Sequence, residues 1–113
     1  DDGKAAADAV SSANPLSDAP EPGEGPSRES RENGNYDVLF CGDINEESVH
    51  VSVAGDMDPG YGSTSKMIAE SAICLVKECA DLAGGIYTPA PSMGIKLIKR
   101  LQDNAGLTFK IEN

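Results

Sequence analysis

The chain has 113 residues, of which 39% are hydrophobic, and its 19 acidic side chains against 9 basic ones give a formal net charge of −10. This length allows at most one domain. The acidic balance argues against a nucleic-acid partner, because phosphates are bound by a surplus of Lys and Arg. No run of residues approaches the length of a transmembrane segment.

The first 35 residues differ in composition from the rest. They hold four prolines and eight acids against three bases, and Val10 and Leu16 are their only large apolar residues. Such a segment buries too little apolar surface to offset its ordering entropy. We therefore expect residues 1–35 to be mostly a disordered acidic arm rich in Pro, Gly and Ser. One short helix is expected near its end, capped by Ser27 and stopped at Gly34.

The expected folded part, residues 36–113, begins with two strands. Residues 36–42 carry apolar side chains on both alternating faces, which predicts a strand buried on both sides. Residues 49–54 alternate three valines with His50, Ser52 and Ala54, which predicts a strand with one solvent-facing side. With a polar turn between them, the two strands are expected to form a hairpin.

A helix is predicted over residues 64–80, with Ser63 or Thr64 as its N-cap. Its apolar stripe consists of Ile68, Ala72, Leu75, Val76 and Cys79. A second helix is predicted to follow Thr88 as N-cap, with Pro89 in its first turn.

Gly106 is the expected stop of the second helix, and residues 107–112 alternate as a final strand. The order β-β-α-α-β places the chain in the α+β class: a hairpin, two helices and a terminal strand.

The cysteines and the single histidine do not form a metal-binding pattern. Cys41, Cys74 and Cys79 are odd in number and include no C-x-x-C pair, and His50 is the only histidine. We therefore expect no metal site and three reduced thiols.

The segment from Gly60 to Lys66 reads Gly-Tyr-Gly-Ser-Thr-Ser-Lys and lies between a predicted strand and a predicted helix, where backbone N–H groups can hold an anion. It is not a P-loop, because Lys66 follows the hydroxyl residues, and a dinucleotide fingerprint would need glycine at Ser65. Two interpretations stay open. Either the segment is a capped helix with turn glycines and a solvated lysine, which local chemistry favours, or its side chains line part of a ligand cleft. The cleft candidates are Tyr61, Ser63, Thr64, Ser65 and Lys66.

Four stretches of the chain carry a family resemblance. They are Pro22-Gly23-Glu24-Gly25-Pro26-Ser27, Asp58-Pro59-Gly60-Tyr61-Gly62-Ser63-Thr64-Ser65-Lys66-Met67, Gly84-Gly85-Ile86-Tyr87-Thr88-Pro89-Ala90, and Leu97 to Leu101 followed by Ala105-Gly106-Leu107-Thr108-Phe109. In order and spacing they resemble the C-terminal end of saccharopine dehydrogenase-like oxidoreductases, including the trans-acting enoyl reductases of lipid biosynthesis. The resemblance runs from about Pro22 to the C-terminus and leaves residues 1–14 unmatched.

This resemblance implies a longer parent enzyme, with a Rossmann domain at its N-terminus and an α+β substrate domain. The chain begins with Asp1 rather than Met, which predicts a processed or excised piece. Its sequence has no Gly-rich βαβ start like that of the family, so the resemblance implies a truncated piece that lacks the Rossmann domain and is inactive alone. NAD or NADP would be bound by the full-length parent and not by this segment. The missing domain is the expected partner, and it would cover the apolar stripe of the first long helix. A homodimer, and a peripheral association of a cytoplasmic protein with membranes or lipid bodies, stay open.

For the site, the resemblance implies that the cleft candidates face the space between the cofactor and substrate domains. Asp58, Pro59, Gly60 and Gly62 would shape the loop, and catalytic residues are not identified. The alternative function is a non-catalytic module in which the acidic arm and a small α+β domain capture a protein partner.

Overall fold

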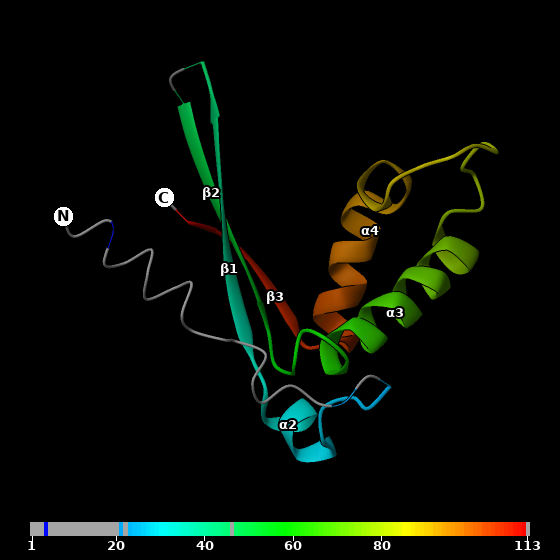
Figure 1. Cartoon of the computed structure of the whole chain (residues 1–113). Coiled ribbons are helices and arrows are strands. Elements are labelled where there is room, and N and C mark those ends of the chain that lie inside the picture. The colour runs from blue at the N-terminus through cyan, green and yellow to red at the C-terminus, as the bar shows by residue number, and fades with distance from the viewer. Residues whose placement is uncertain (1–3, 5–20, 22, 46, 113) are drawn as a thin grey trace.

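The computed structural model describes residue 4, residue 21, residues 23–45 and residues 47–112. Its elements in chain order are helix α2 (Arg28–Asn33), strands β1 (Tyr36–Ile44) and β2 (Glu47–Gly55), helices α3 (Gly62–Glu78) and α4 (Pro89–Asn104), and strand β3 (Leu107–Glu112). The predicted α+β class and the order β-β-α-α-β are confirmed. Figure 1 shows α3 and α4 together on one side of the sheet, with α2 at the end where β1 begins.

The three strands form one antiparallel sheet in the order β1-β2-β3. Val53 of β2 lies opposite Val38 of β1 and Phe109 of β3. Because side chains alternate across a strand, these three share the face that the helices cover in part. The hairpin turns at Asn45, whose φ of 51° is one that Asn tolerates better than most residues.

Helix α4 starts and stops as predicted. Thr88 is its N-cap, Pro89 is its first residue, and Gly106 follows it with a φ of 71°. The single helix expected between Thr88 and Gly106 is interrupted at Gly94, where φ is 48° and ψ is −131°. Only glycine adopts such a backbone readily, so α4 is two helical segments joined at a kink.

The buried core is small. It lies between the two long helices and between α4 and the end of the sheet where β3 begins. One cluster joins Cys74 and Cys79, at the end of α3, to Met93 of α4. The other consists of Leu101, Ala105 and Leu107, with Val53, Met67, Leu97 and Phe109 packed against it. Leu97 contacts both clusters, so α4 connects the helix pair to the sheet.

An arginine reinforces the contact between α3 and α4. The Arg100 guanidinium donates from Nε to Glu70 (2.8 Å) and from Nη1 to Glu78 (2.7 Å). These two carboxylates hold the pKa of Arg100 above its usual value. The residues of α3 that face α4 are therefore Met67, Glu70, Cys74 and Glu78, and this stripe is half polar.

The predicted apolar stripe of α3 is not the face that packs against α4. Ile68 and Val76 are 69% and 80% exposed, and Ala72 and Leu75 are exposed too; of the predicted stripe, only Cys79 is buried. The exposure of these four residues is compatible with the expectation that a missing domain covers them, which stays a prediction.

The prediction that β1 is buried on both faces is wrong. Val38, Leu39 and Phe40 are all exposed, because β1 is an edge strand and α4 packs on β3 and the end of β2 instead. Figure 1 shows the hairpin extending well past the helices.

The last part of the predicted acidic arm has a defined place. Helix α2 is capped by Ser27, whose Oγ accepts from the Ser30 backbone N–H (3.1 Å), and it ends at Gly34, so the predicted short helix is confirmed. The Arg31 carbonyl accepts a hydrogen bond from the Asp58 N–H (3.0 Å), which ties α2 to the loop before α3. The prediction of disorder for residues 1–3, 5–20 and 22 lies outside the described residues.

The described residues contain no helix with enough length and apolar character to cross a bilayer. Within the same part of the chain, all three cysteines are free thiols, with Cys41 exposed and the other two buried. There, no three side chains of the His, Cys, Asp and Glu types gather as a metal site would require.

Candidate functional site

The loop between β2 and α3 is organised by one carboxylate. Asp58 accepts hydrogen bonds from the backbone N–H groups of Tyr61 (2.7 Å), Gly62 (3.0 Å) and Gly60 (3.3 Å). The bond from Gly62 is the main reason that the pKa of Asp58 is lowered, with the bond from Tyr61 second; the Arg31 charge also contributes. A charge that accepts several N–H groups stays ionised to lower pH.

This arrangement corrects one expectation. The N-cap of α3 is Tyr61 rather than Ser63 or Thr64, and Tyr61 makes no capping bond through its side chain. The Asp58 carboxylate accepts from Gly62, the first residue of the helix, and the Asp58 carbonyl accepts from the Ser63 N–H. Because Asp58 already accepts from these donors, they are not free to hold the phosphate that a Gly-rich loop can bind in other proteins.

The hydroxyls of Ser63 and Thr64, which were expected to cap the helix, form hydrogen bonds with other partners. Ser63 is 0% exposed, and its Oγ lies 2.8 Å from the Tyr36 hydroxyl at the start of β1. This bond links the sheet to the first turn of α3. The Thr64 hydroxyl donates to the Pro59 carbonyl within the loop.

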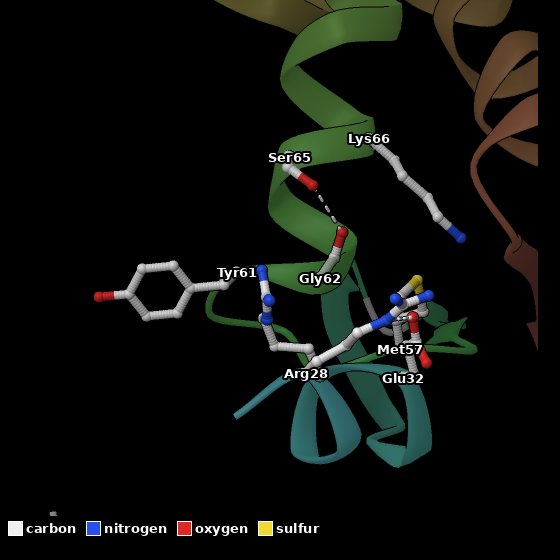
Figure 2. A pocket seen from close by; sticks show the side chains of 8 residues that line it. Arg28, Glu32, Met57, Tyr61, Gly62, Ser65 and Lys66 are labelled. Atoms are coloured by element: carbon white, nitrogen blue, oxygen red, sulfur yellow. Dashed lines mark hydrogen bonds and ion pairs between the residues drawn. The ribbon is translucent and has the colours of Figure 1, made fainter. Parts of the chain in front are cut away.

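A cavity of about 230 Å³ lies between α2 and the start of α3. Three of the five cleft candidates line it, namely Tyr61, Ser65 and Lys66; Gly62 of the loop lines it as well. Figure 2 shows Tyr61 and Lys66 extending to opposite sides of the first turn of α3, with α2 beneath them. Ser63 and Thr64 are not among the lining residues.

The sequence analysis missed the other half of this cavity. Arg28, Arg31 and Glu32 of α2 and Met57 of the loop complete its lining. A signal for the arginines was present, because residues three apart on a short capped helix share one face. What the sequence does not reveal is that this face lies next to the Gly-rich loop.

The cavity's charges are largely matched by local partners. Arg28 pairs with Glu32 (2.7 Å), and Lys66 lies 3.6 Å from Asp56. Ser65 donates its hydroxyl hydrogen to the Gly62 carbonyl (2.9 Å), as Figure 2 shows. No nucleophile–base pair is present among these described residues, so the arrangement suits positioning a polar group rather than covalent catalysis.

Comparison with known proteins finds relatives of one kind. The chain is 35% identical over 85 residues to a protein of Mycobacterium tuberculosis strain H37Rv that is provisionally named a trans-acting enoyl reductase. It is 34% identical over 85 residues to a trans-acting enoyl reductase of Mycobacterium bovis BCG, and 32% identical over 84 residues to one of Mycobacterium ulcerans.

This chain is similar to a segment of trans-acting enoyl reductases. Each match covers 73% of this chain and 20% of the relative, so the chain spans about a fifth of the length of the curated relatives that it matches. No protein-family model matches the chain, and no solved structure matches it.

Proposed function

We propose that this chain is the C-terminal segment of a saccharopine dehydrogenase-like oxidoreductase of the trans-acting enoyl reductase type. The complete enzyme would transfer a hydride from NADH or NADPH to the carbon–carbon double bond of an enoyl substrate in lipid biosynthesis. The observation that carries the proposal is the 35% identity over 85 residues to a mycobacterial relative five times longer than the match.

The segment is proposed to be inactive without the rest of the enzyme. The α3 N-terminus does not fit a dinucleotide, because Asp58 already accepts from the N–H groups of Gly60, Tyr61 and Gly62. In this proposal the nicotinamide cofactor would be held by a Rossmann domain in the remaining part of the enzyme, where it would supply the hydride.

In this proposal, the cavity between α2 and α3 faces the junction with the remaining part of the enzyme. Lys66 and Arg31 would hold the polar end of the substrate by charge, and the Tyr61 and Ser65 hydroxyls would orient it. Such groups accelerate a reaction by fixing geometry, because hydride transfer needs the two reacting carbons aligned.

The test is a chimera of the M. tuberculosis relative in which residues of this chain replace the matched segment. Oxidation of NADPH is followed with an enoyl thioester for three proteins: the chimera, the relative with the segment deleted, and the isolated 113-residue chain. The proposal is supported if the chimera is active and the other two proteins are not. Turnover by the isolated chain, or by the relative without the segment, refutes it.

The role of the cavity is tested within an active chimera. Lys66→Ala should lower kcat/KM about tenfold by loosening the substrate's alignment. The matched control is Lys99→Ala, which removes an exposed lysine on α4 whose ion pair joins it only to Asp103. An equal effect of the two variants on kcat/KM would refute the proposed role of the cavity in substrate binding.

A further inference from the structure

The sheet carries a continuous apolar surface that the helices do not cover. Val38 and Phe40 of β1, Val49 and Val51 of β2, and Ile111 of β3 alternate onto the same face, in register with one another. All five are exposed except Val51, which is half-buried. We call these five residues the apolar sheet face.

The five residues of the apolar sheet face are uncharged, although a quarter of the chain is charged. Among the residues of β1, β2 and β3 that alternate onto the same side of the sheet, Glu47 at the turn end of β2 is the only acidic or basic one. An uncharged group of this size next to an open strand marks an interaction surface rather than an ordinary solvated sheet.

The backbone beside the face is open as well. β1 is nine residues long, and among the described residues only β2 pairs with it, so its outer N–H and C=O groups have no strand partner. A long edge strand with apolar side chains is a template for a further strand.

The charges on β1 select the kind of strand that can pair there. Asp37 and Asp43 are its only charged residues, both are exposed, and neither forms an ion pair within the described part of the chain. They lie at equal distances along the strand on either side of Phe40, its central residue. In an antiparallel pair of two copies centred there, each Asp37 would face the other copy's Asp43, and like charges placed opposite are destabilising.

We propose that β1 and the apolar sheet face receive a β-strand from the portion of the longer enzyme that the relatives carry beyond the matched segment, and not a second copy of this chain. The strand would have apolar residues opposite Val38 and Phe40, and Lys or Arg opposite Asp37 and Asp43. This inference rests on the proposed function, because it names the surface by which the segment joins the rest of the enzyme. The match covers only 20% of the relative, so most of the longer enzyme lies outside it and can provide the strand. The net charge of −10 disfavours self-association of this chain.

The recognition chemistry can be tested on the isolated chain, without enzyme activity. The probe is a synthetic nine-residue peptide with valine opposite the even-numbered residues of β1, lysine opposite Asp37 and Asp43, and threonine elsewhere. The control peptide has the same composition in scrambled order, so that generic attraction to an acidic chain is equal. Amide hydrogen exchange, read by mass spectrometry, reports where each peptide binds.

The expected result is slower exchange over β1 with the designed peptide, and binding at least about tenfold weaker with the scrambled one. Phe40→Asp should abolish the protection. Leu39→Asp is the matched control, because Leu39 is 58% exposed and Phe40 56%, but Leu39 lies on the opposite face. Equal effects of both variants, equal protection by both peptides, or protection of α3 instead would overturn the proposal.

The same chain decides between occupants. Sedimentation velocity should show a monomer, and a dimer that Phe40→Asp dissociates would replace the proposed partner with a second copy. In the chimera described above, β1 should be protected whether or not the chimera reduces its substrate. If β1 is protected in a chimera that does not reduce its substrate, the strand-binding surface is supported and only the proposed function is refuted.

Discussion

The hydrogen bond between Tyr36 and Ser63 is the link by which the sheet fixes the start of α3. The two hydroxyl oxygens are 2.8 Å apart, and Ser63 is fully buried. The Tyr36 ring lies over Gly55, its cross-strand neighbour, where any side chain would overlap it. The perturbation to make is therefore Ser63→Ala, combined with Tyr36→Phe in a double-mutant cycle.

The expected cost follows from burial. Ser63→Ala leaves the Tyr36 hydroxyl without its partner, which should lower the free energy of unfolding by about 1–3 kcal/mol. Tyr36→Phe should cost a similar amount for the same reason. The double variant removes both hydroxyls together, so it should lose less than the sum, with a coupling of about 1 kcal/mol.

The assay is urea unfolding of the four proteins, followed by far-ultraviolet circular dichroism because the chain has no tryptophan. For a folded part of this size, about 1 kcal/mol corresponds to a shift of roughly 4–8 °C in Tm, so thermal melts give a second reading. Additive losses within about 0.3 kcal/mol would show that the two hydroxyls do not interact, and the account of how the loop is positioned would fail.

Three further predictions follow from single residues. Asp58→Asn should make the free energy of unfolding depend less on pH at acid pH. The pKa of Asp58 in the folded protein is below the usual 3.8, so its charge stabilises the fold above the unfolded pKa. This stabilisation is lost as the pH falls through the folded pKa. Thermal melts of both proteins between about pH 6 and pH 2 would check it, and parallel acid limbs would contradict it. Leu101→Ala should lower the free energy of unfolding by about 2–5 kcal/mol, since Leu101 is buried against the sheet; a denaturation midpoint unchanged in urea would show that this core is absent. Iodoacetamide should label Cys41 quickly and Cys74 and Cys79 only on unfolding, because burial, followed by the contact with Cys79, raises the pKa of the Cys74 thiol; three equal rates by mass spectrometry would contradict the buried placement.

The secondary structure of this chain was predictable because its signals are local. The alternation in residues 107–112, the Thr88-Pro89 start of α4 and Gly106 after its end each depend on neighbours within a few positions. The short helix after Ser27 was predictable for the same reason. The Gly-rich loop was also visible as a feature, and three of its five candidate side chains do line a cavity.

The sequence by itself determined which segments form helices and strands, since hydrophobic period and capping residues act over one or two turns. Only the tertiary structure decided which faces are buried. The apolar side chains on both faces of β1 predict burial on both sides. The strand is exposed nonetheless, because α4 packs against β3 and the end of β2. The duties of Ser63 and Asp58 were likewise set by Tyr36 and by the path of the loop, because a hydroxyl or carboxylate bonds to whichever donor the fold brings within about 3 Å.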